Sequence, residues 1–262
     1  MHSMLNITSR AARKAGDFLA KYYDNIEASN TNKNHFLTYV NKEAERLMIE
    51  IILKYYPKHT VINEQSGQIT GRDRSITWII YPIDSINNFI KRIPHIAVSI
   101  SVCFKGRTEI AVVYDPMRNE LFSTIRGHGA QMNSYRLRSS SRKNLAGTIL
   151  SINSPIQQQN PKYYTEYSNL LLKLLNNCID LRCTGSSTLD IAYLAAGRVD
   201  CLFLFDIGLT TCHTTSELLV VESGGWVKDF NLVKINNNIQ LDCKILAGNS
   251  RIVQDIINII SK

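Results

Sequence analysis

The sequence contains no apolar run of the roughly 18 residues that a membrane span needs, and its first residues lack the apolar core of a signal peptide. It also has no CxxC pair and no zinc-like spacing among its six cysteines. At 262 residues the chain is long enough to fold without disulfides. These absences argue against a membrane or zinc-finger protein. We expect reduced thiols and a cytoplasmic location.

Acidic residues are scarce relative to basic ones, with 22 against 30, which gives a net charge of +8 and a pI of about 9.2. A basic surface suits acidic partners such as RNA or phosphorylated ligands. However, the positive charge is spread along the chain, and abundant Lys, Asn and Ile are typical of a bias in base composition. The sequence shows no RNA-binding motif and no interleaving of aromatic and basic residues.

The first half predicts two helices followed by antiparallel strands. Apolar residues at helical spacing predict helices over 4–22 and 42–56, the second ended by Pro57. Shorter apolar stretches predict strands, and a hairpin turn is expected at 105–107. The strands expected in this half are Thr60–Asn63, Thr77–Tyr81, Ala97–Phe104, Glu109–Tyr114, Leu121–Ile125 and Ala130–Asn133.

After the polar segment 139–144 the pattern changes to alternating strands and helices. The strands expected are Thr148–Asn153, Ile179–Cys183 and Asp200–Phe205. The helices expected are Tyr167–Asn176, Ser187–Ala196, Thr215–Glu222 and Ser250–Ile260. This order predicts two sheet-containing halves, residues 1–140 and 141–262, packed as one unit in an α/β/α/β/α sandwich.

Two acids follow predicted strands and are candidates for a metal site. Asp84 ends the stretch TWIIYPID, and Glu64 follows a short strand in VINEQSG. Carboxylates fixed at strand ends suit a hard cation, and the loop after Asp84 could present amides to an anion. Acids at strand ends are also commonly solvated, so this pattern alone leaves both interpretations open.

Longer segments resemble the inositol monophosphatase family over nearly the whole chain, and within it the bacterial type whose members also act as Nus factors. The segments are MLNITSRAARKAG, YPKHTVINEQSG, KRIPHIAVSI, KGRTEIAVVYDPMRNELF, AAGRVD and ELLVVESGG. The resemblance implies a homodimeric sandwich fold and Mg²⁺-dependent hydrolysis of a phosphate monoester. It places Glu64, Asp84 and the backbone carbonyl of Ile83 at metal or catalytic positions. Ile83, Asp84, Ser85, Ile86, Arg182 and Asp206 match phosphate- or substrate-side positions.

Several family residues are replaced. The family loop Asp-Pro-(Ile/Leu)-Asp-Gly-Thr-Thr-Asn-Phe reads YPIDSINNF here, so Tyr81 replaces the first aspartate, Ser85 the glycine and Ile86 the threonine. Asn41 replaces another acid. The last family aspartate falls on Cys212 or on His213, depending on the direction of counting. Clustered Mg²⁺ ions need several carboxylates, which a neutral phenol, an amide and a thiol do not supply.

We therefore expect weak or lost Mg²⁺ binding and absent or vestigial phosphatase activity. A new nucleophile pair of Cys212 and His213 has no third group to orient it. The resemblance implies a second role, in the antitermination complex that lets RNA polymerase transcribe ribosomal RNA operons. In that role the protein would contact NusA and RNA polymerase. That role needs surface and dimer geometry rather than hydrolysis. Contact with ribosomal RNA is a further expectation, and residual Mg²⁺-dependent hydrolysis of inositol 1-phosphate is the alternative.

Overall fold

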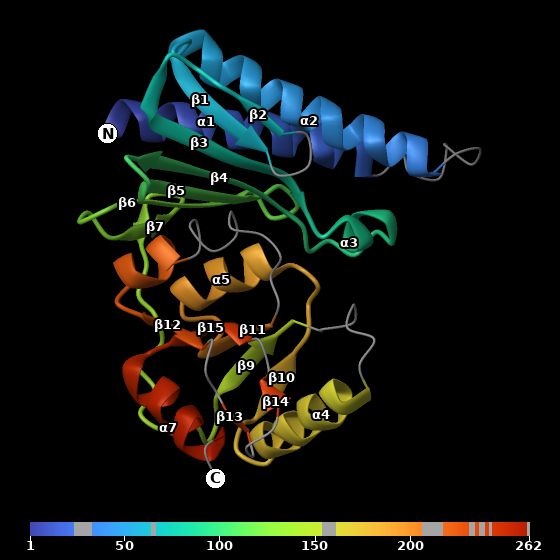
Figure 1. Ribbon diagram of the computed structural model, residues 1–262, viewed down its shortest axis with the longest axis vertical. Coiled ribbons are helices and arrows are strands. Elements are labelled where there is room, and N and C mark those ends of the chain that lie inside the picture. The colour runs from blue at the N-terminus through green and yellow to red at the C-terminus, as the bar shows by residue number, and fades with distance from the viewer. Residues whose placement is uncertain are drawn as a thin grey trace.

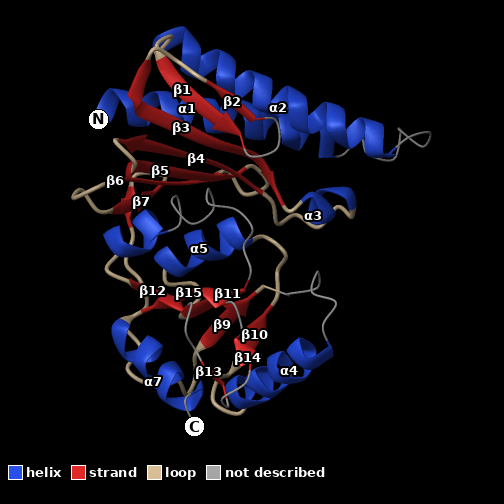
Figure 2. Ribbon diagram, viewed as in Figure 1, coloured by secondary structure: helices blue, strands red, loops and turns tan. Residues whose placement is uncertain are grey.

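A computed structural model of the chain shows five layers, in the order helices, sheet, helices, sheet, helices (Figures 1 and 2). The predicted α/β/α/β/α sandwich is confirmed. The structure describes residues 1–23, 33–63, 67–153, 161–205, 217–230, 234–235, 239–240 and 243–260. In this part of the chain, no helix has the length and apolar character needed to cross a membrane.

The first two layers are a helix pair and an eight-stranded sheet. The helices are α1 (His2–Tyr23) and α2 (Lys33–Tyr55). The sheet has the order β2-β1-β3-β4-β5-β6-β7-β8, antiparallel except for the β1–β3 pair. Its strands are β1 (His59–Asn63), β2 (Gly67–Ile69), β3 (Asp73–Asp84), β4 (Ala97–Phe104), β5 (Arg107–Asp115), β6 (Glu120–Ile125), β7 (Ala130–Met132) and β8 (Tyr135–Arg136).

The helices pack closely on this sheet because small residues of α1 face it. Ala11, Ala12 and Ala15 are fully buried, and a Cβ at Gly16 would lie 2.5 Å from the Tyr114 ring of β5. Only glycine permits that approach. Tyr55, at the end of α2, is 44% exposed.

The second sheet has the order β10-β9-β11-β15-β12. Helices α4 and α7 cover its outer face through a shared apolar cluster (Figure 1). The elements are β9 (Ile149–Ile152), α4 (Pro161–Leu175), β10 (Asp180–Arg182), α5 (Ser187–Ala195), β11 (Cys201–Phe205), β12 (Trp226–Phe230), β15 (Cys243–Gly248) and α7 (Ser250–Ile260). A separate ribbon joins β13 (Lys234–Ile235) and β14 (Ile239–Gln240).

The middle layer joins the two sheets through opposite faces of α5. Leu189, Ala192 and Ala195 pack against the first sheet. Ile191 and Leu194 pack against β11 and β15 of the second. Both faces of this short helix are therefore apolar, and it is buried along nearly its whole length. The division of the chain at 140/141 stays a prediction.

Element boundaries differ from the sequence predictions in identifiable places. Helix α2 begins nine residues before the predicted start at 42, because Phe36 and Val40 continue its buried face. Strand β3 continues through Pro82 to Asp84, since its register against β4 shifts there, and a bulge tolerates proline. The short helix α3 (Ile86–Ile90), β12 and β15 were not predicted. Residues 217–222 are helical, whereas the start of the helix predicted at Thr215 lies outside the described residues.

The cysteines that can be placed are free thiols. Cys103 and Cys201 are buried, Cys178 is partly buried and Cys183 is exposed. Cys212 and the side chain of Cys243 lie outside the described part of the structure.

A buried histidine links β1 to β3. Trp78 Nε1 donates a hydrogen bond of 2.9 Å to His59 Nδ1, and the Tyr56 ring stacks on the imidazole at 4.8 Å. Burial lowers the pKa of His59, and nearby Asp73 opposes this only in part. The imidazole therefore accepts the Trp78 hydrogen bond in its neutral form.

Acidification should destabilise the protein through His59. Its pKa is lower in the folded chain than the usual value of about 6.5, so the unfolded state takes up a proton first as the pH falls from 7 to 5. The reference variant is His59→Gln, because Gln keeps an acceptor for Trp78 but does not titrate. The unfolding free energy of the wild type minus that of the variant should decrease as the pH falls from 7 to 5. Urea unfolding at several pH values measures it. A constant difference would contradict the assignment.

Candidate functional site

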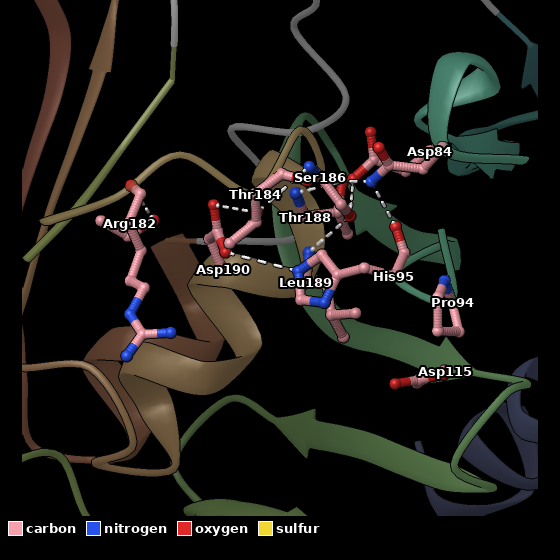
Figure 3. Close-up of polar contacts among 12 residues, drawn as sticks. Asp84, Pro94, His95, Asp115, Arg182, Thr184, Ser186, Thr188, Leu189 and Asp190 are labelled. Atoms are coloured by element: carbon pink, nitrogen blue, oxygen red, sulfur yellow. Dashed lines mark hydrogen bonds and ion pairs between the residues drawn. The ribbon is translucent and has the colours of Figure 1, made fainter. Parts of the chain in front are cut away.

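The candidate site lies where the end of β3 meets the beginning of α5. The register of β3 against β4 shifts between Tyr81 and Asp84, and the Asp84 side chain reaches residues of the second half. Its Oδ2 accepts hydrogen bonds from Ser186 Oγ at 2.6 Å and from the Thr188 backbone N–H at 2.8 Å (Figure 3). The Asp84 carboxylate thus joins the first sheet to the helix between the sheets.

Opposing effects act on the Asp84 carboxyl group. Burial raises its pKa, and the hydrogen bonds from Ser186 and Thr188 partly counter that rise because they favour the carboxylate. The carboxylate also lies at the N-terminus of α5, where unpaired N–H groups favour negative charge. Ser186 is itself the N-cap of α5 and accepts a bond from the Leu189 N–H.

Asn88 of α3 makes a second connection between the halves. Its Nδ2 donates to the carbonyl oxygen of His95 at 2.8 Å and to that of Thr184 at 2.9 Å. Gly185 lies against it, with φ of +85°, and a Cβ there would be 3.0 Å from Asn88 Oδ1. Glycine at 185 therefore supplies both the backbone conformation and the space that Asn88 occupies.

A third set of contacts surrounds Asp190, which is buried in the first turn of α5. Thr184 Oγ1 lies 2.8 Å from both Asp190 carboxylate oxygens. His95 Nε2 lies 3.5 Å from Asp190 Oδ1 (Figure 3). The His95 ring also packs edge-on to Tyr193. Contacts with both Thr184 and His95 hold α5 in register against the segment that follows α3.

The structure separates Arg182 from Asp84, although both were predicted on the substrate side. The Arg182 guanidinium pairs with Asp180 at 2.5 Å and is more than half exposed. Figure 3 shows that its side chain points away from Asp84. Ile83 is buried in the first core, and Ile86 packs against the same core. Glu64, Asp206, Cys212 and His213 lie outside the described residues.

The structure describes two of the positions at which the sequence analysis expects a family acid to be replaced. Tyr81 is half-buried on β3 opposite Ser99 of β4, and Asn41 is half-buried on α2. Within the described ranges, no group of three His, Cys, Asp or Glu side chains is arranged to hold a metal. Of the expected acidic ligands, only Asp84 lies in those ranges, and its Oδ2 already accepts two bonds. These donors do not by themselves fit a magnesium site.

Comparisons with known proteins agree with this architecture. The model of the inositol monophosphatase family matches residues 1–261. The chain belongs to the inositol monophosphatase family. It is 52% identical over 258 residues to the Nus factor SuhB of Escherichia coli K12, covering 97% of this chain and 94% of that protein. It is 42% identical over 264 residues to the Nus factor SuhB of Pasteurella multocida, covering 98% and 96%.

Solved structures of this family share the fold. The native SuhB protein of Bartonella henselae superposes with a TM-score of 0.86 at 28% identity, covering 99% of both chains. The inositol monophosphatase of Anabaena superposes with a TM-score of 0.80 at 26% identity, covering 99% of this chain and 95% of that one.

The loop between β3 and α3 turns at a residue with a left-handed backbone. Ser85 has φ of +67°, in the left-handed region that the glycine expected at this position adopts freely. A serine there costs about 1 kcal/mol. Its hydroxyl accepts a long bond of 3.4 Å from the Asn88 N–H, which closes the first turn of α3. Ile86 gives the loop an apolar anchor in the first core.

The sequence analysis missed most partners of Asp84. Ser186, Thr188, Asn88 and the Asp190 contacts were not identified as site residues. One available signal was Ser186, an N-cap residue type directly before a predicted helix. The pairing itself was hidden, because Asp84 and Ser186 are 102 residues apart.

Replacing Asp84 with alanine should destabilise the protein by about 2 kcal/mol, because the Ser186 hydroxyl and the Thr188 N–H would be buried without an acceptor. Chemical unfolding measures the change. The control is Asp180→Ala, which removes a surface ion pair to Arg182 and should cost about 0.5 kcal/mol or less. Equal effects of the two changes would contradict the role of Asp84.

Proposed function

We propose that this protein acts as a Nus-type docking factor in the antitermination complex of ribosomal RNA operons, through contacts with NusA and RNA polymerase. It works as a cytoplasmic homodimer, and its phosphatase activity is lost or vestigial. The support from relatives is the name Nus factor SuhB, which proteins 52% and 42% identical to this chain carry. Docking needs a folded surface and does not need a metal cluster.

The main observation in support of lost phosphatase activity is that the Asp84 carboxylate is hydrogen-bonded within the protein. A magnesium ligand must direct its oxygens to the ion at about 2.0–2.1 Å. Here Asp84 is buried, and its Oδ2 receives the Ser186 hydroxyl and the Thr188 N–H. Next to it, Tyr81 places a phenol, neutral at pH 7, where the family has a bridging carboxylate. Both features favour a structural role for this part of the loop.

One observation favours residual hydrolysis as a second candidate. Strands β1 and β3 are parallel neighbours, with Asn63 opposite Ile80, so their carboxyl ends lie at the same edge of the sheet. Glu64 follows Asn63 in the sequence, and Asp84 ends β3. A weak Mg²⁺ site built on Glu64 and Asp84 would turn over inositol 1-phosphate slowly. Such turnover would rise with Mg²⁺ and disappear in Glu64→Gln and Asp84→Asn.

The two candidates differ in their dependence on metal. We expect capture of NusA, through its acidic C-terminal repeats, to be equal in Mg²⁺ and in EDTA. Calorimetric titration with Mg²⁺ should give no binding heat at millimolar metal. Hydrolysis of inositol 1-phosphate should not rise with Mg²⁺. NusA capture that requires Mg²⁺, or Mg²⁺-dependent turnover abolished by Glu64→Gln, would favour the second candidate.

Restoring acids should recover some metal binding if the missing charge is the cause of its loss. The double variant Tyr81→Asp/Cys212→Asp returns two carboxylates, and calorimetry should then detect Mg²⁺. The matched control, Tyr81→Asn/Cys212→Asn, has similar side-chain size without charge and should bind none. If the aspartate variant folds and binds no Mg²⁺, these residues do not occupy the metal positions.

A further inference from the structure

Two exposed histidines from distant parts of the sequence face each other on the surface of the first half. His2 lies in the first turn of α1, and His128 lies in the turn between β6 and β7. Their ring centres are 5.3 Å apart, and the ring planes are inclined at 78°. Figure 1 shows the start of α1 at the opposite end of the first sheet from α3, which follows Asp84.

The backbone of the turn that carries His128 is held in place by hydrogen bonds. The His128 N–H donates to the Ile125 carbonyl oxygen at 3.0 Å. The Glu222 carboxylate accepts bonds from the Gly127 N–H at 2.6 Å and from the Gly129 N–H at 2.8 Å. Both glycines have φ of +79°, which a larger residue would adopt only with strain. The position of His128 is therefore set by the turn itself.

Helix α1 fixes the position of His2 in a similar way. The Leu5 N–H donates to the Met1 carbonyl oxygen at 3.0 Å, so the first turn that contains His2 is hydrogen-bonded. Further along the helix, fully buried alanines such as Ala11 and Ala12 pack it on the first sheet. A ligand shared by the two imidazoles would thus require rotation of two side chains and little movement of the backbone.

The charged groups around the turn balance one another. The Glu222 carboxylate lies at its backbone, as its bonds to the two glycines require. The Arg126 guanidinium is directed toward β5, where its Nε donates to the Thr108 carbonyl oxygen at 2.9 Å. The Arg136 guanidinium lies beside Gly129 and offsets the carboxylate. Affinity for a cation must therefore come from ligand bonds of the imidazoles rather than from local negative charge.

The spacing of the two rings suits imidazoles that share one metal ion. A Zn–N bond is about 2.0–2.1 Å long, and the centre of an imidazole ring lies roughly 1 Å beyond its nitrogen. Two rings at the tetrahedral angle then have centres about 5 Å apart, close to the 5.3 Å of this pair. Neutral imidazole nitrogen is a ligand for zinc, nickel and copper, whereas magnesium prefers oxygen.

We propose that His2 and His128 bind one divalent transition-metal ion of the zinc, nickel and copper class, with water completing its coordination. Two protein ligands give weaker binding than the three or four of catalytic and structural zinc sites. The ion ties the first turn of α1 to the β6–β7 turn, which Glu222 connects to the helical residues 217–222 of the second half. The proposal uses no residue of the Asp84 loop and does not depend on the proposed docking function.

The test follows the imidazole NMR signals of protein labelled with ¹³C in its six histidines during titration with Zn²⁺. Each signal is assigned by its loss in a His→Gln variant, and the pH is held above 7 because only neutral imidazole binds metal. The signals of His2 and His128 should shift together and saturate on one curve. This measurement reports on imidazoles alone, so zinc bound at cysteines does not enter it.

Single variants test whether the two histidines share the ion. In His2→Gln and in His128→Gln, the remaining histidine should bind Zn²⁺ about tenfold more weakly or worse, since even the loss of an outer contact to a ligand costs this much. The matched control is His35→Gln, which removes another exposed histidine, on α2, and should leave the affinity of the pair unchanged.

Thermal unfolding gives a second measurement of the same site. An ion that binds the folded pair and not the unfolded chain raises the unfolding midpoint. The midpoint of the wild type minus that of His128→Gln should therefore increase with Zn²⁺ concentration, and the same difference for His35→Gln should not.

Three results would overturn the proposal. The first is that neither signal of the pair shifts at millimolar Zn²⁺. The second is that only one of them shifts, which would show an ion held by a single histidine. The third is an equal loss of affinity in His35→Gln and His128→Gln, which would show nonspecific adsorption to exposed histidines.

Discussion

The hydrogen bonds that Asp84 accepts from Ser186 and Thr188 determine how the two halves of this protein meet. One buried carboxylate ends a strand of the first sheet and satisfies N-terminal groups of the helix between the sheets. Asn88 reinforces the joint through the carbonyl oxygens of His95 and Thr184. Without these polar contacts, apolar packing of α5 would hold the layers together but would not fix their register.

The same joint includes Asp84, at which the sequence predicts the metal-binding loop of the family. Ile86 of that loop packs against the first core, and Tyr81 is half-buried on β3. Ser85 keeps a glycine-like conformation at an energetic cost.

Local patterns in the sequence predicted most of the fold. Alternation and helical spacing placed α1, β4, β5, α5 and α7 to within a few residues, because each has a single apolar face or is apolar throughout. Errors arose where tertiary contacts override local preference. The strand predicted over Thr77–Tyr81 stops before Pro82, yet a bulge lets β3 continue to Asp84. Strands β12 and β15, which flank each other in the second sheet, gave too weak a pattern to be recognised.

The sequence by itself determined the family and the positive charge, because both are properties of residue type and order, and it predicted which family acids are replaced. Only the tertiary structure decided that Asp84 meets Ser186, that Arg182 points elsewhere and that Arg10 meets Tyr55. The partners in the Asp84 and Arg10 contacts are 102 and 45 residues apart. Contacts at such separations follow from how helices and sheets pack, and no local pattern in the chain encodes them.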